Sequence, residues 1–152
     1  MADIWKKLNL KDQARVFVLN APASFEPTVK ALSGVEVRRE LSSTSTVSFV
    51  LAFLTERKEI AKIAKALAKI ADGDAVIWIA YPKKSSKLYT CDFSRDSGWE
   101  PLGEAGFEGV RQVAIDEDWS ALRFRRVEYI QRMTRDKERA MTREGKAKTA
   151  RP

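Results

Sequence analysis

Apolar residues along this chain alternate between short continuous runs and a helical spacing. Residues 15–20, 46–54 and 75–81 are almost wholly apolar, which is typical of strands that are buried on both faces. Between the last two runs, the apolar residues from Ile60 to Ala71 fall on one face of a predicted helix, and lysines occupy the opposite face. Thr55 precedes this helix and is expected to cap it.

Weaker patterns predict the remaining elements. These are a helix at residues 25–32, a strand at 35–41, a helix near 96–106, and strands at 110–115 and 119–127. Asp72, Gly73 and Asp74 are expected to end the long helix before the fourth strand begins at Ala75. The turn between the last two strands is so short that these strands must be antiparallel.

Strands that alternate with helices predict an α/β fold. We expect a three-layer, Rossmann-like sheet that is mostly parallel, has about six strands and ends in a C-terminal antiparallel hairpin. A closing hairpin of this kind is the layout of S-adenosylmethionine-dependent methyltransferases. By analogy with them, the strand order is 2-1-3-4-6-5.

The composition limits the chemistry. The 152 residues include no histidine, which excludes Ser-His-Asp and Cys-His catalytic systems and any metal site built on imidazole. Cys91 is the only cysteine, so a thiolate zinc cluster within one chain is excluded as well. We expect no metal and favour a non-enzymatic role. The lone cysteine, with no secretory signal and no membrane-length apolar run, predicts a cytoplasmic protein.

Positive charge is concentrated at the C-terminus. We predict a single Rossmann-like α/β domain at residues 1–131 and a basic tail, helical or disordered, at 132–152. Of the net charge of +7, the tail carries +5 and the body only +2. The tail's candidate contacts to a polyanion are Arg132, Arg135, Lys137, Arg139, Arg143, Lys146, Lys148 and Arg151. The alternative is a tail that only solubilises the protein.

The turn after the first strand lacks the glycines of a cofactor site. In open α/β sheets, ligands bind at the carboxyl ends of the strands where the strand order reverses. Here that turn is Asn20-Ala21-Pro22-Ala23-Ser24, and proline also removes one N–H donor. The acidic residue expected at the end of the second strand is missing. We therefore predict no dinucleotide or S-adenosylmethionine cofactor.

The same edge of the predicted sheet carries hydroxyl and ammonium groups. The loop after Tyr81 holds three lysines and two serines, which suit a phosphate group. The predicted anion or ligand crevice comprises Asn20, Ser24, Thr55, Tyr81, Lys83, Lys84, Ser85 and Lys87. The alternative interpretation is an ordinary solvated loop.

Two further stretches have a structural and a functional interpretation. Asp116, Glu117 and Asp118 could bind a cation or act as acid and base, but we interpret them as a solvated turn. Its candidate partners are Arg111, Arg123 and Arg125. Residues 119–126 interleave arginines with aromatics, as in proteins that bind single-stranded nucleic acid. We favour instead an edge strand whose arginines prevent further pairing.

Four stretches together resemble a known family. They are VLNAP at 18–22, WIAYPKKSS at 78–86, DSGWEPLG at 96–103 and VRQVAIDEDWSALRFRRVE at 110–128. The chain resembles a family of short bacterial proteins known only as a domain of unknown function. This resemblance implies a bacterial cytoplasmic protein with a Rossmann-like body, similar in outline to methyltransferases without their glycine motif. It assigns no catalytic residue.

The leading functional hypothesis is a non-enzymatic binding module. Its basic tail, helped by Lys83, Lys84 and Lys87, would contact RNA or a ribonucleoprotein. One alternative is an enzyme or sensor that holds a nucleotide or another phosphorylated ligand in the strand-end crevice. Another is a protein-interaction subunit that docks through its C-terminal hairpin.

Overall fold

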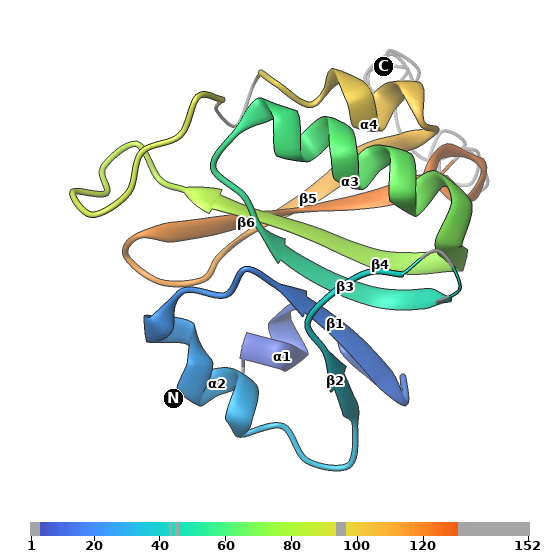
Figure 1. Ribbon diagram of the computed structural model, residues 1–152, viewed down its shortest axis with the longest axis horizontal. Coiled ribbons are helices and arrows are strands. Elements are labelled where there is room, and N and C mark those ends of the chain that lie inside the picture. The colour runs from blue at the N-terminus through green and yellow to red at the C-terminus, as the bar shows by residue number, and fades with distance from the viewer. Residues whose placement is uncertain (1–3, 43, 45, 94–96, 131–152) are drawn as a thin grey trace, which may run out of the picture.

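Six strands form one sheet in the order β2-β1-β3-β4-β6-β5 (Figure 1). The computed structural model describes residues 4–42, 44, 46–93 and 97–130. The strands are β1 (Arg15–Leu19), β2 (Glu36–Arg38), β3 (Val47–Phe53), β4 (Ala71–Pro82), β5 (Phe107–Ala114) and β6 (Trp119–Arg126). β1 to β4 pair in parallel, and β6 is antiparallel to both β4 and β5. The predicted strand order and closing antiparallel pair are confirmed.

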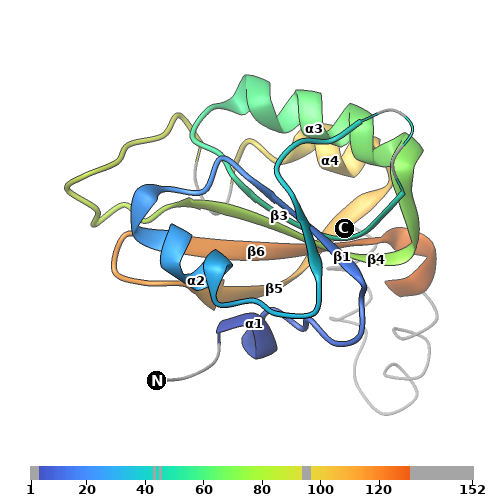
Figure 2. The same cartoon turned by 60° about the horizontal axis from the view of Figure 1, so that its bottom comes forward.

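Helices cover both faces of this sheet. They are α1 (Ile4–Lys7), the 3₁₀ helix η1 (Ala23–Phe25), α2 (Glu26–Lys30), α3 (Arg57–Ile70) and α4 (Glu100–Glu104). Figure 2 shows α3 and α4 on one side of the sheet and α1 and α2 on the other. We call these sides the α3 face and the α1 face. The predicted three-layer α/β architecture is confirmed.

Alternating side chains divide the core between the two faces. Phe17 and Ile77 pack with Leu67 of α3 in one cluster of buried residues. Val18 and Trp78 pack with Leu8 in the other. The Trp78 indole Nε1 also donates a hydrogen bond of 2.7 Å to the Leu8 carbonyl, which ties the N-terminal segment to the sheet. Burial on both faces explains why the central strands are continuously apolar.

The long helix α3 has a different cap from the one that the sequence predicted. Glu56, not Thr55, is the N-cap residue, and it forms a capping box with Glu59. The backbone N–H of Thr55 instead donates to Glu59 Oε1 at 3.1 Å. The Leu54 N–H still donates to the Ala80 carbonyl of β4. The chain is therefore part of the sheet up to Leu54, and the helix begins one residue too far along for Thr55 to be its N-cap.

The start of β4 is the main departure from the predicted boundaries. β4 begins at Ala71, directly after α3, instead of at Ala75. The three polar residues expected to form a turn are inside the strand, where the pairing with β3 shifts between Val47 and Phe49. Gly73 has a φ of 55°, which suits such an irregularity. A bulge therefore accommodates residues whose polarity alone predicted a loop.

None of the helices in the described ranges combines the length and the apolar character needed to cross a bilayer.

Candidate functional site

The turn after β1 keeps a tight backbone without glycine. Asn20 has a φ of 56°, a left-handed conformation that asparagine tolerates better than most residues. Pro22 follows, and its carbonyl accepts the Phe25 N–H at 2.9 Å as η1 begins. Since proline has no N–H and the Phe25 N–H is already bonded, this turn offers fewer free donors than a glycine-rich turn.

A pocket of about 490 Å³ opens at the carboxyl end of β4, on the α3 face. This volume is in the usual range for small-molecule sites. The end of β4, the loop after it and the two hairpin strands contribute its lining. The lining residues are Tyr81, Pro82, Lys83, Lys84, Ser86, Tyr89, Thr90, Cys91, Phe93, Gln112 and Ser120. We call this cavity the Tyr81 pocket.

The Tyr81 pocket brings together part of the predicted crevice. Tyr81, Lys83 and Lys84 all line it. Ser85 and Lys87 belong to the same loop and are exposed, but they are outside the lining. The lysine-rich loop therefore borders a cavity through two of its three lysines.

The other three predicted crevice residues lie elsewhere. Ser24 lines a separate pocket beside α1 and α2, together with Asp116 of the hairpin turn. Asn20 is exposed in the turn after β1, and Thr55 is half-buried at the start of α3. The sequence placed all of them at one edge of the sheet, and none of them lines the Tyr81 pocket. Thr55 is nevertheless next to it, because its carbonyl accepts the N–H of Asp92, between the lining residues Cys91 and Phe93.

Two residues of the pocket come from strands that sequence reasoning did not assign to it. Ser120 pairs with Tyr81 in the β4–β6 register, and Gln112 Nε2 donates a hydrogen bond of 3.2 Å to Tyr81 Oη. Ser120 is only 6% exposed, and its hydroxyl forms no hydrogen bond with another described residue. The sequence signal for Ser120 was a polar residue between two apolar neighbours, Trp119 and Ala121, whereas Gln112 follows Arg111 and had no such signal.

The acidic turn between β5 and β6 has a structural role. Asp116 Oδ1 accepts the backbone N–H groups of Asp118 and Trp119 at 2.8 and 2.9 Å. Asp118 Oδ1 accepts the Ser86 hydroxyl at 2.8 Å, and its carbonyl accepts the Lys83 N–H at 2.8 Å. The turn therefore fixes the lysine loop that borders the pocket. No cluster of metal-ligating side chains occurs among the residues that the structure describes.

Three arginines gather on the α1 face of the hairpin, and we call them the arginine face: Arg111, Arg123 and Arg125. Arg111 and Arg123 are directly paired across β5 and β6. Arg123 Nε is buried and has no hydrogen-bond partner. Desolvation, and then the positive charges of Arg125 and Arg111, lower the pKa of the Arg123 guanidinium despite an opposing effect of Asp74.

The arginines do not have the roles that the sequence suggested for them. Arg125 Nε donates to Asp74 Oδ1 at 3.0 Å, so it pairs with a carboxylate of β4. β6 lies between β4 and β5, so the interpretation of residues 119–126 as an edge strand was wrong. The last strand, β6, pairs with β4, so β5 is the edge strand of the sheet.

The predicted polyanion contacts between Arg132 and Arg151 lie outside the described residues. The described chain reaches Ile130, just past the end of β6, where Val127 donates its N–H to the Gly106 carbonyl. The loop with Lys83 borders the opposite end of β6, beside Trp119. The last described residues and the lysine loop are therefore near opposite ends of one strand.

Comparison with known proteins identifies the fold. No family model matches the chain, and no curated protein matches it significantly. The resemblance to a bacterial family of unknown function is therefore not supported by these comparisons. An S-adenosylmethionine-dependent methyltransferase from Aquifex aeolicus superposes with a TM-score of 0.57 at 17% identity, over 80% of this chain and 87% of that one.

Two further methyltransferase structures are similar. The N-methyltransferase NodS from Bradyrhizobium japonicum, in complex with S-adenosyl-L-homocysteine, gives a TM-score of 0.52 at 11% identity, over 82% of this chain and 83% of that one. The mitomycin 7-O-methyltransferase MmcR gives 0.55 at 9% identity, over 82% and 53%. At these identities the likeness concerns architecture alone, and the chain has the α/β, Rossmann-like fold that these methyltransferases share.

Proposed function

We propose that this protein is a non-enzymatic binding module that contacts a polyanion, namely RNA or a ribonucleoprotein. The body at residues 1–131 would present the arginine face, and the basic tail at 132–152 would add contacts to the phosphate backbone. The observation that carries the proposal is the direct pairing of Arg111 and Arg123 with no ion pair for either guanidinium within the described chain.

Such a pair suits a row of phosphates. Like charges directly opposite each other in a sheet are unfavourable, and a half-buried guanidinium with an unbonded Nε adds a desolvation cost. A phosphate would neutralise the repulsion and accept the free N–H groups. Because opposite residues in antiparallel strands are about 5 Å apart, one or two phosphates could bridge both side chains.

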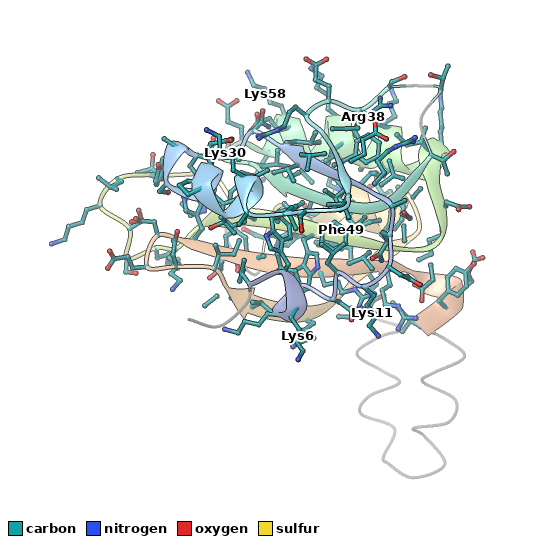
Figure 3. All side chains as sticks on the ribbon, turned by 90° about the horizontal axis from the view of Figure 1, so that it is seen from below. Lys6, Lys11, Lys30, Arg38, Phe49 and Lys58 are labelled. Carbon is teal, nitrogen blue, oxygen red and sulfur yellow. The ribbon has the colours of Figure 1, made fainter. Side chains whose placement is uncertain are left out.

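The N-terminal segment adds charge on the same side of the sheet. Trp5 and Leu8 pack in the α1-face core together with Phe49. Lys6 and Lys11 are exposed, and in Figure 3 both point away from the sheet. Exposed lysines on the same side of the sheet as the arginine face would increase attraction to a polyanion without specifying its sequence.

Methyl transfer is a weaker candidate. Structurally similar proteins include S-adenosylmethionine-dependent methyltransferases. In this chain, the residues at the carboxyl ends of β1 and β2 do not suit that cofactor. Pro22 takes the place of a residue with an N–H, Asn20 carries a side chain where glycine would leave room, and β2 ends at Arg38 instead of an acidic residue. The chain also has no histidine. These features support binding without catalysis, in the cytoplasm, where RNA is abundant.

The test measures binding of labelled single-stranded RNA by fluorescence anisotropy over a series of salt concentrations. Four proteins are compared: the full chain, a truncation at residue 131, the double variant Arg111→Gln/Arg123→Gln, and the control Lys62→Gln/Lys65→Gln. The control removes the same charge from the exposed side of α3, on the other face of the sheet.

We expect both the truncation and the arginine variant to bind more weakly and with a shallower salt dependence. Each lost phosphate contact should reduce the slope of log K against log salt by about 0.7. The control should bind like the full chain. Equal binding by the full chain and the truncation, or binding that salt does not affect, would contradict the proposal and favour a protein partner at the β5 edge.

A further inference from the structure

We propose that the Tyr81 pocket binds a small phosphorylated ligand with a planar ring, of the nucleoside monophosphate class. This site is distinct from the proposed polyanion contact. It is on the α3 face at the carboxyl end of β4, whereas the arginine face is on the α1 face of the hairpin.

The walls of the pocket suit a planar ring. Tyr81 and Phe93 both line it, and their ring centroids are 6.0 Å apart. Trp99 packs edge-on against Tyr81 at 5.6 Å, which holds the tyrosine ring in place from behind. Rigid aromatic walls bury a flat ligand surface at little cost in side-chain entropy.

The rim of the pocket supplies two cations. Neither Lys83 nor Lys84 forms an ion pair with any residue in the described ranges. The carboxylate beside them, Asp118, already accepts the Ser86 hydroxyl. A phosphate monoester carries nearly two negative charges at neutral pH, so it can pair with both ammonium groups, whereas a carboxylate satisfies only one.

The Ser120 hydroxyl is a further polar group of the pocket lining. Ser120 lines the cavity, is 94% buried and forms no hydrogen bond within the described chain. Gln112 holds Tyr81 Oη through its amide nitrogen, which leaves the amide oxygen available to a ligand donor. The Ser120 hydroxyl and the Gln112 amide oxygen can therefore both bond to polar atoms of a ligand in the cavity.

Hydrogen bonds within the protein hold the loop that carries the lysines. Ser86 Oγ accepts the backbone N–H groups of Leu88 and Tyr89, each at 3.2 Å, while it donates to Asp118. The Lys83 N–H is fixed to the Asp118 carbonyl. Because little of this loop needs to be ordered on binding, a modest number of contacts can give measurable affinity.

The test is isothermal titration calorimetry of the full chain with adenosine monophosphate, adenosine and inorganic phosphate. We expect the monophosphate to bind with a dissociation constant below about 1 mM, and the two fragments to bind at least about tenfold more weakly. If the monophosphate shows no binding at about 10 mM, the proposal fails.

Variants locate the site. Lys83→Ala should weaken binding about tenfold, and Ser120→Ala should weaken it severalfold with little change in shape. Lys87→Ala is the matched control, because it removes the same charge from the same loop outside the lining, and it should bind like the unmodified chain. Equal losses for Lys83→Ala and Lys87→Ala would overturn the site. Circular dichroism checks that each variant is folded.

The two proposals fail separately. Ser120→Ala should leave RNA affinity nearly unchanged, Lys83→Ala should lower it no more than Lys87→Ala does, and Arg111→Gln/Arg123→Gln should leave the affinity for the monophosphate unchanged. Loss of monophosphate binding in the arginine variant would overturn the assignment to the Tyr81 pocket without affecting the polyanion proposal.

Discussion

Arg111 and Arg123 are paired residue to residue across β5 and β6, and neither forms an ion pair within the described chain. Their neighbour Arg125 has Asp74 as its partner. The fold therefore holds two guanidinium groups side by side, and the repulsion between their like charges lowers the stability of the folded state. Residues that lower stability in this way are typical of binding surfaces, where the ligand supplies the missing charge.

Replacing Arg123 with methionine should stabilise the free protein by about 1 kcal/mol, because it removes both the repulsion and the desolvated guanidinium while keeping the aliphatic stem. Urea denaturation of the full chain measures this. The control is Arg126→Met, which should destabilise, since Arg126 Nη2 donates to the Ala71 carbonyl at 2.8 Å and lies over the Phe107 ring. A destabilised Arg123→Met protein would show that Arg123 has a favourable partner.

Replacing Asp116 with alanine should cost about 1 to 2 kcal/mol of folding free energy. Its Oδ1 accepts two backbone N–H groups in the hairpin turn, and both would lose their partner. Asp116→Asn keeps an acceptor oxygen and should cost less. Glu117→Ala, at an exposed position of the same turn, should leave the stability unchanged. Thermal denaturation of the three variants and the unmodified chain measures these differences. Equal effects at 116 and 117 would contradict a structural role for Asp116.

Gly98→Ala should destabilise the protein more than Gly34→Ala. Both glycines have positive φ angles, 100° and 75°, so each alanine carries a backbone cost of about 1 kcal/mol or more. At Gly98 a Cβ atom would also lie 2.5 Å from Phe93 Cβ, whereas nothing lies within 4 Å at Gly34. The difference between their denaturation midpoints isolates this clash. Similar midpoints would mean that Phe93 can move away from the added Cβ atom at little cost in free energy.

Glu36 should contribute to stability at neutral pH but not in acid. Hydrogen bonds from Arg38, and then from Arg15, hold the pKa of its carboxyl below the ordinary 4.5. A group whose pKa is lowered by folding stabilises the protein above its unfolded-state pKa, and that contribution is lost as the pH falls through the folded-state value. Urea midpoints of the full chain and of Glu36→Gln should therefore differ at pH 7 and converge as the pH falls below the ordinary carboxyl pKa and through the lowered one. A difference that stays constant with pH would contradict this assignment.

Periodicity predicted the architecture well because the central strands are buried on both faces. The runs that became β1, β3 and β4 are apolar without interruption, and the face of α3 that contacts the sheet repeats with a helical period. The boundaries failed where a tertiary contact outweighed local preference. The bond from Leu54 to Ala80 keeps the chain in the sheet up to Leu54, so Glu56 is the N-cap of α3 instead of Thr55, and the irregular pairing with β3 includes Asp72 to Asp74 in β4.

The candidate sites were only partly predictable. Lys83 and Lys84 were found because strand ends in α/β sheets are recognisable in sequence. Ser120 and Gln112 were missed because only the register of the hairpin against β4 brings them to Tyr81. The pairing of Arg111 with Arg123 depends equally on register, since a slip of one residue would send one side chain to the opposite face.

The sequence by itself determined the layers of this protein, the parallel order of its strands and its lack of imidazole chemistry, because burial periods and composition are local properties of the chain. Only the tertiary structure decided which polar groups meet. Residues far apart in sequence become neighbours through strand pairing, and that pairing left the Ser120 hydroxyl and the two opposed arginines without partners of their own.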